Sequence, residues 1–146
     1  MQEAKDFTTI CGSAPSEILA LIALRSSTHI LEKNRRLLAS NLKAVAQFMA
    51  KWRALFEWSR PAGGSVCWPR LLSAEPVDAF CLRVLSGCGV LLLPSTCYDH
   101  GLDGEQAARF RLGFGREDCM QVLAVLEAWL EQEQAAGRLA VSSPPP

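Results

Sequence analysis

Apolar residues recur at intervals of four and three along residues 38–52, and this pattern constrains the fold more than any other feature. The apolar positions are Leu38, Leu42, Val45, Met49 and Trp52, while charged residues such as Lys43 fall on other faces. This spacing keeps the apolar side chains on one side of an α-helix. It predicts a long amphipathic helix with one buried stripe.

Three further helices are predicted from their start and stop signals. The stretch from Ser13 to Glu17 contains Pro15 and suits the first turn of a helix that runs on to about Arg25. Residues 26–28 then weaken the pattern and could cap the next helix. Pro76 opens a helix over 77–85, which Gly87 and Gly89 stop, and helical spacing returns over about 117–134.

Four short segments have the composition of strands. Residues 55–59 and 65–68 flank a turn that contains Gly63 and Gly64, so we expect a hairpin. Residues 90–93 form an apolar run that Pro94 should end, and residues 108–114 alternate between apolar and polar side chains. The alternation predicts a strand with Phe110 and its neighbours in the core and Arg111 on the other face.

The expected fold class is α+β, with a small, mainly antiparallel sheet covered on one face by helices. A chain of 146 residues can bury one sizeable core but is short for two ordinary domains. We expect an extended segment over 1–12, one domain over 13–134 and a disordered tail over 135–146, where three prolines end the sequence.

Charge and cysteine usage exclude several classes of function. Fifteen basic residues balance fifteen acidic ones with no local basic run, so neither nucleic acid nor an anionic membrane is expected as a partner. The six cysteines form no CxxC pair and have no histidine at zinc-finger spacing, so no metal site is predicted. No apolar run approaches the roughly 20 residues of a membrane span, and residues 1–9 lack a signal-peptide core, which predicts a cytoplasmic protein.

Arg111 is the candidate binding residue. It lies in mid-strand between Phe110 and Leu112, and the following Gly113 leaves room beside it for a ligand. A guanidinium matches a carboxylate with two parallel hydrogen bonds. The pattern alone nevertheless favours a solvated arginine on an exposed sheet face.

Other candidate sites have weaker support. Gly12 and Ser13, before a helix start, could bind an anion, although an ordinary capped helix is the commoner arrangement. Ser95, Asp99 and His100 supply the residue types of a hydrolase without the GxSxG sequence that usually surrounds the nucleophile. A serine-directed phosphonate that leaves Ser95 unlabelled would remove that hypothesis.

The order of the motifs resembles the C-terminal small-domain portion of class I/II (fold type I) pyridoxal-phosphate (PLP)-dependent aminotransferases. Residues 5–17 resemble the segment that follows the cofactor lysine in that family, and residues 61–64 resemble its glycine hairpin. Residues 89–94 and 110–115 resemble its strand at the active-site side and its substrate-carboxylate strand, so the resemblance runs from about Lys5 to Leu130. Ser95 departs from it, because relatives often have glycine after the proline.

The resemblance implies a function for Arg111 and implies that the groups that bind PLP lie elsewhere in the family's sequence. In the family the matching arginine holds the α-carboxylate of the amino acid or 2-oxo acid, which reverses the preference for a solvated Arg111. The Schiff-base lysine, and most groups that hold PLP, precede the segment matching Lys5, which should not itself be given that role. The chain is therefore expected to contribute no catalytic residue, to bind no PLP alone and to be inactive alone.

Two hypotheses follow from the resemblance. In the first, the chain is part of an aminotransferase, completed by a large domain or a partner chain, with a homodimer expected for the complete enzyme. In the second, it is a non-catalytic interaction or regulatory module derived from an aminotransferase small domain. The sequence does not identify the amino donor or acceptor.

Overall fold

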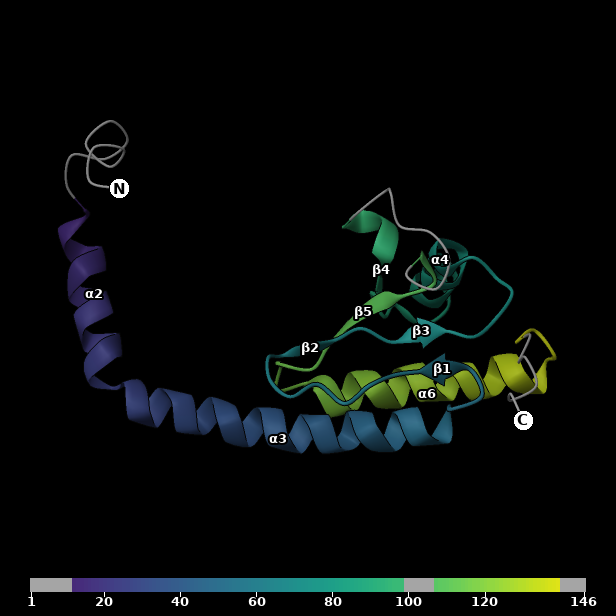
Figure 1. The fold of residues 1–146 in the computed structure, drawn as a ribbon, viewed down its shortest axis with the longest axis horizontal. Coiled ribbons are helices and arrows are strands. Elements are labelled where there is room, and N and C mark those ends of the chain that lie inside the picture. The colour runs from purple at the N-terminus through teal and green to yellow at the C-terminus, as the bar shows by residue number, and fades with distance from the viewer. Residues whose placement is uncertain (1–11, 99–106, 140–146) are drawn as a thin grey trace. The chain divides into compact units, whose positions relative to one another are not determined.

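The computed structural model describes residues 12–98 and 107–139. The chain divides into two compact units, residues 1–36 and 37–146. The described elements, labelled in Figure 1, are α2 (Ala14–Arg25), α3 (Ser27–Lys51), β1 (Phe56–Glu57), β2 (Val66–Cys67), β3 (Arg70–Leu71), α4 (Val77–Cys88), β4 (Leu93–Pro94), the 3-10 helix η1 (Ser95–Cys97), β5 (Phe110–Gly113) and α6 (Cys119–Ala135).

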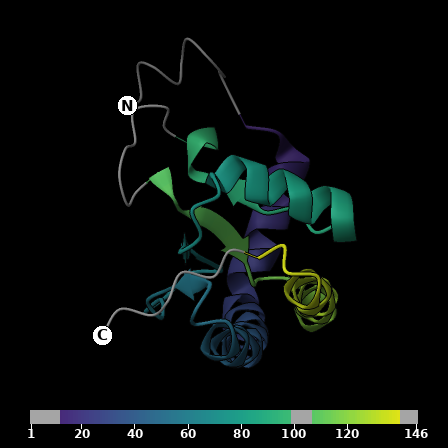
Figure 2. The same ribbon diagram turned by 90° about the vertical axis from the view of Figure 1, so that its right-hand side faces the viewer.

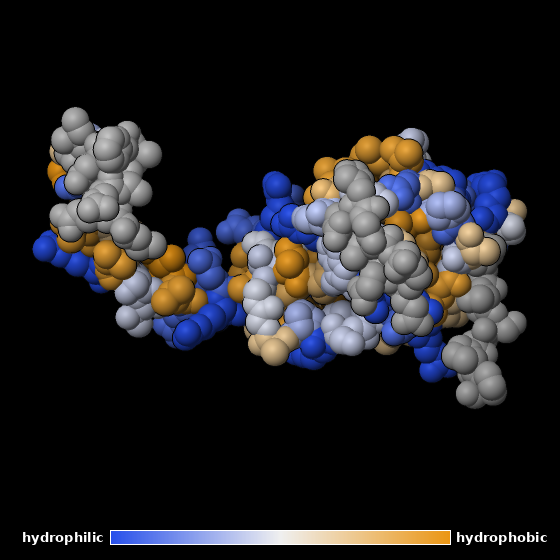
Figure 3. Space-filling view, turned by 45° about the horizontal axis from the view of Figure 1, so that its top comes forward, coloured by the Kyte–Doolittle hydropathy of each residue, from blue (hydrophilic) through white to orange (hydrophobic). Residues whose placement is uncertain are grey.

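In the first unit, α2 begins and ends where its sequence predicts, but it has no buried residue. Its large aliphatic side chains are spread around the helix rather than gathered in one stripe, and each is more than half exposed: Ile18, Leu19, Leu21, Ile22 and Leu24. Figure 3 shows this apolar surface on α2. A helix that is apolar on all sides is typical of one that packs inside a larger protein.

In the second unit, the strands form two small antiparallel sheets. The larger has the order β2-β5-β4, with Val66 opposite Gly113 and Leu93 opposite Arg111. The smaller pairs β1 with β3, with Phe56 opposite Leu71. Helices and small antiparallel sheets together confirm the α+β fold class.

The predicted hairpin is wrong. Its two segments, β1 and β2, do not pair with each other, because β1 pairs with β3 and β2 pairs with β5. The side chain of Phe56 packs against Phe80 and Phe110 in the core, and Leu71 of β3, which lies opposite Phe56, is buried with it. The glycine-bearing segment is thus a loop between two sheets.

The strand predicted over 90–93 is shifted toward the C-terminus. Ladder pairing involves Leu93 and Pro94, so Pro94 lies inside β4 rather than after it. Proline has no N–H to donate, and an edge strand such as β4 tolerates it. The helix predicted over 77–85 also extends further, to Cys88, before Gly89 ends it with a φ of 73°.

One hydrophobic core joins the buried face of β5 to α3, α4 and α6. Phe110, Leu112 and Phe114 are buried, and the strand alternates between buried and exposed residues as predicted. The helix partners are the stripe around Val45 and Met49, the Phe80 face of α4 and the Leu126 face of α6. Figure 2 shows α3 and α6 end-on, side by side, next to the sheet. Helices therefore cover one face of the sheet, as predicted.

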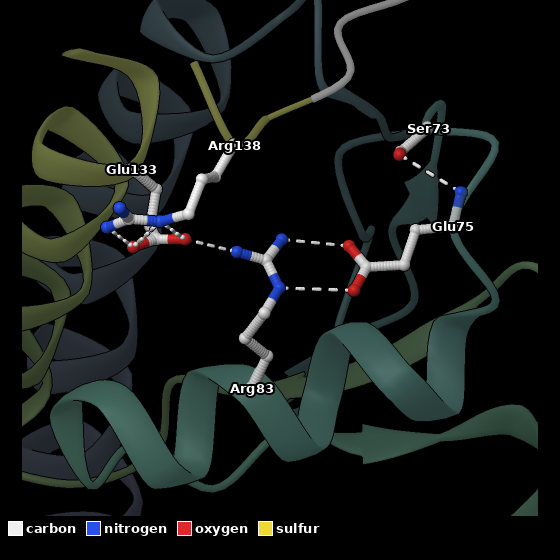
Figure 4. Close-up of polar contacts among 5 residues, drawn as sticks. All are labelled: Ser73, Glu75, Arg83, Glu133 and Arg138. Carbon is white, nitrogen blue, oxygen red and sulfur yellow. Dashed lines mark hydrogen bonds and ion pairs between the residues drawn. The ribbon is translucent and has the colours of Figure 1, made fainter. Parts of the chain in front are cut away.

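An ion network ties α4 to the end of α6 (Figure 4). Arg83 of α4 makes a bidentate pair with Glu75, at 2.8 and 3.1 Å, and also pairs with Glu133 of α6. Arg138 closes on the same Glu133 carboxylate, with Nε at 3.0 Å from Oε1. Leu139 packs against the core. The predicted tail over 135–146 is thus described only to residue 139, and its disorder remains a prediction, as do the predicted domain limits.

Candidate functional site

Arg111 lies on the exposed face of the central strand of the larger sheet. The burial of Phe110 and Leu112 on the other side of β5 forces the side chain of Arg111 outward. Its cross-strand neighbour on β4 is Leu93. A Cβ atom added at Gly113 would meet nothing within 4 Å, so open space lies beside Arg111 on the same face. The predicted outward position of the Arg111 side chain is confirmed. Its role in binding a carboxylate stays a prediction.

Two aromatic residues accompany Arg111. Its Nη1 donates a hydrogen bond to the hydroxyl of Tyr98, with an N–O distance of 3.1 Å. The ring of Tyr98 packs edge-on against Trp68, with 5.1 Å between ring centroids. Sequence reasoning passed over Tyr98, because a lone aromatic residue in a loop carries no periodic signal.

Arg109 directly precedes β5 and has a structural contact. Its Nη1 donates to the backbone carbonyl of Trp68 at 3.0 Å, and its Nε atom is buried with no hydrogen-bond partner among the described residues. A guanidinium held against the backbone in this way is less available to a ligand than that of Arg111. Arg109 and Arg111 are therefore not equivalent.

Ser95 anchors the segment that carries Tyr98. Its fully buried side chain donates from Oγ to the carbonyl of Ala107 at 2.7 Å, and its backbone N–H donates to the carbonyl of Arg109 at 2.8 Å. Ser95 stands where the resembling family often has glycine, and its side chain adds a hydrogen bond that glycine could not make. A buried hydroxyl that donates to a backbone carbonyl is also poorly placed as a nucleophile, which counts against the hydrolase hypothesis; Asp99 and His100 lie outside the described residues.

Asn41 of α3 supports the other end of β5. It is buried, and its Nδ2 donates to the carbonyls of Phe114 and Arg116 at 2.9 and 2.7 Å. The sequence analysis missed this residue. The signal available was an amide on the same helical face as Leu38, Leu42 and Val45, where a polar side chain needs a buried partner.

The anion site considered at Gly12 and Ser13 is disfavoured. Ser13 makes no side-chain cap bond to α2. A Cβ atom added at Gly12 would lie 2.6 Å from Oε1 of Glu17, so a carboxylate of the chain itself lies against this position. That negative charge would repel an incoming anion.

The described residues do not fit PLP by themselves. A PLP site of this type needs a lysine for the Schiff base, and the three described lysines, Lys33, Lys43 and Lys51, all lie on α3 rather than on β5 or the strands beside it. Lys51 is engaged by Glu127 and Glu131 of α6. Lys5 lies outside the described residues.

Three of the described cysteines are buried and are not activated nucleophiles. Burial raises the pKa of the Cys67 and Cys81 thiols to about 12, and burial also raises the pKa of Cys119. These thiols stay protonated near neutral pH and behave as small apolar groups. No three histidine, cysteine or acidic side chains gather into a metal-ligand set within residues 12–98 and 107–139.

Solved structures are similar to nearly the whole chain. A PLP-dependent aminotransferase from Streptococcus suis 89-1591 superposes with a TM-score of 0.77 at 28% identity, covering 99% of this chain and 35% of that protein. The PLP-dependent cyclase OrfR superposes with a TM-score of 0.74 at 27% identity, over 90% of this chain and 35% of its own. The chain has the fold of an aminotransferase small domain.

Sequence comparison points to the same group of proteins. Capreomycidine synthase from Streptomyces vinaceus is 26% identical over 110 residues, which cover 75% of this chain and 27% of that enzyme. No protein-family model matches the sequence. The small-domain fold thus spans about a third of the length of the proteins that it resembles.

In the described part of the chain, no helix has the length and apolar character to span a membrane.

Proposed function

We propose that the exposed face of β5 binds the carboxylate of an amino acid or 2-oxo acid through Arg111, as part of a PLP-dependent enzyme with the aminotransferase fold. The observation that carries this proposal is the position of Arg111. It projects from the central strand, beside the open space at Gly113, with its guanidinium held by Tyr98. A planar guanidinium fixed in this way can bind both oxygens of a carboxylate.

The role of this site is to hold and orient the substrate. The strand is part of a sheet packed on a continuous core, so a carboxylate bound to Arg111 is fixed to a rigid element. Arg111 carries a permanent positive charge and moves no proton. The chain therefore contributes binding energy and orientation to the reaction.

PLP chemistry is proposed to depend on polypeptide beyond these 146 residues. From the resemblance we expect the Schiff-base lysine before the segment matching residues 5–11, and no described lysine lies on β5 or the strands beside it. The similar proteins include both an aminotransferase and a cyclase, so the proposal does not extend to one reaction type. A homodimeric complete enzyme and a cytoplasmic location remain predictions from the sequence.

The carboxylate proposal is tested by titrating the 15N-labelled full chain with sodium propionate at constant ionic strength. We expect saturable shifts of the Arg111 Nε–Hε NMR signal and of the backbone amide signal of Gly113, which lies on the same face of β5. Followed at the Gly113 amide, which both proteins have, Arg111→Gln should weaken propionate binding about tenfold or more, because a hydrogen-bonded charge pair is lost. Arg36→Gln is the matched control, since Arg36 is exposed and pairs with Glu32 on α3. If Arg111→Gln bound propionate as tightly as the wild type, the site assignment would be wrong.

The second candidate function is a non-catalytic interaction module. The exposed aliphatic side chains of α2 favour it, because a free apolar surface of this kind commonly binds another protein. The two functions differ in the partner. A partner that brings a bound PLP spectrum supports the enzyme, whereas a partner unrelated to aminotransferases, with no PLP absorbance in the complex, supports the module.

A further inference from the structure

Tyr98 and Trp68 reach the Arg111 face from opposite sides of the central strand. Trp68 directly follows β2, and Tyr98 directly follows η1, which itself follows β4. Because the strand order is β2-β5-β4, the two aromatic residues start on either side of β5. Their rings nevertheless meet, with centroids 5.1 Å apart and ring planes at 77°. The pair therefore spans the strand that carries Arg111.

The position of Tyr98 is set by a chain of backbone and side-chain bonds. Its N–H donates to the carbonyl of Ser95 at 2.9 Å, and Ser95 is anchored to Ala107 and Arg109, as described above. Thr96, in the same turn, donates to the carboxylate of Asp78 on α4. The first two residues of the turn are thus bonded to the segment that leads into β5 and to α4, and the Tyr98 N–H closes the turn, so the Tyr98 ring has a defined place even though it is half exposed.

The hydrogen bond between Arg111 and Tyr98 has a direction that matters. Arginine can only donate, so the phenol oxygen of Tyr98 accepts from Nη1. Within residues 12–98 and 107–139, the hydroxyl proton of Tyr98 is then left for another acceptor. A carboxylate that binds the remaining N–H groups of Arg111 would bring an oxygen within reach of this O–H group.

We propose that Tyr98 is a second carboxylate-binding residue, which positions the Arg111 guanidinium and donates its O–H group to the bound carboxylate. This rests on the proposed function of Arg111. Holding a long arginine side chain in place before the ligand arrives lowers the entropy lost on binding. The phenol donor adds a hydrogen bond to a charged acceptor, which is stronger than one between neutral groups.

The test uses Tyr98→Phe in the 15N-labelled full chain with sodium propionate as the probe. This substitution keeps the ring that packs on Trp68 and removes only the hydroxyl. We expect the dissociation constant to rise about tenfold or more, as for the loss of one charge-assisted hydrogen bond. We also expect the Arg111 Nε–Hε heteronuclear NOE to fall in the absence of propionate. Cys97→Ser, an exposed neighbour in the same turn, should change neither quantity.

The outcomes separate this inference from the function on which it rests. If Tyr98→Phe binds propionate as the wild type does while Arg111→Gln does not bind it, the role of Tyr98 is wrong and the carboxylate site stands. If Arg111→Gln binds as the wild type does, or if the wild type shows no saturable shift, the carboxylate site itself is wrong. An unchanged backbone amide spectrum of Tyr98→Phe confirms that any loss of binding comes from the hydroxyl and not from unfolding.

Discussion

At the scale of single residues, buried hydrogen bonds hold the strand that carries Arg111. Asn41 donates to two carbonyls just beyond the end of β5, and Ser95 donates to the carbonyl of Ala107 just before its start. Each bond pairs a backbone carbonyl group that lies outside β5 and so has no partner in the sheet. The frame of the candidate site thus depends on two polar residues that are themselves buried.

Asn41→Leu should lower the free energy of unfolding by about 2–4 kcal/mol. Two carbonyl groups lose their hydrogen-bond donor, and because they are buried, water cannot readily replace it. Urea unfolding followed by tryptophan fluorescence measures the change. Asn34→Leu, at an exposed position of the same helix, should have little effect. Equal effects of the two substitutions would show that the Asn41 bonds add nothing.

At the scale of elements, the distance between α4 and α6 is set by a close contact. A Cβ atom at Gly87 would lie 2.9 Å from Cε2 and 3.0 Å from Cδ1 of Trp129, both tighter than ordinary packing allows. Trp129 also packs against Phe80 and stacks with the guanidinium of Arg83. A large ring with partners on several sides cannot move freely to make room.

Gly87→Ala should therefore destabilise the chain by about 1–2 kcal/mol, the cost of overpacking less the gain in helix propensity. The melting temperature in a calorimetric scan checks it. Gly63→Ala is the matched control, because a Cβ atom there meets nothing within 4 Å. A stabilised Gly87→Ala protein would mean that α4 and α6 can separate at no cost.

The ion network between the same helices predicts a pH dependence. Arg138 first and Arg83 second hold the pKa of the Glu133 carboxyl below its ordinary value. A carboxyl group with a lowered pKa binds fewer protons in the folded state, so its stabilisation is complete above the unfolded pKa of about 4.3 and is lost as the pH falls through the folded pKa.

The free energy of unfolding should thus fall as the pH is lowered from about 5 to 3, and this slope should be shallower in Glu133→Gln. Urea titrations at several pH values measure it. Glu32→Gln removes an exposed ion pair with Arg36 and serves as the control, since such pairs contribute about 0.3–0.5 kcal/mol. An identical slope in wild type and Glu133→Gln would show that the network does not respond to pH.

At the scale of the whole molecule, α2 carries an exposed apolar surface. No residue of α2 is buried, and the similar structures are about three times as long as the part that this chain matches. Exposed aliphatic surface of this kind drives association in water. We therefore expect the isolated chain to self-associate with increasing concentration.

Leu21→Gln combined with Leu24→Gln should weaken this association about tenfold or more, because each buried leucine contributes roughly 1.5–3 kcal/mol. Sedimentation velocity over a range of concentrations measures it. Ala20→Gln combined with Ala23→Gln places the same polar groups on the same helix and should have a smaller effect. A wild-type chain that stays monomeric at every concentration would contradict the prediction.

The sequence by itself determined the elements whose signals are local. The start of α2 at its proline, the buried stripe of α3 and the alternation that turns Arg111 outward all follow from spacing along the chain, and the motif order indicated the fold. Only the tertiary structure decided how the short strands pair, because β1 and β2 are two residues each and their partners are set by the burial of Phe56 and Leu112 against distant helices. The contact between Tyr98 and Arg111 was decided in the same way. It joins residues 13 positions apart through the pairing of β4 with β5, which no local pattern encodes.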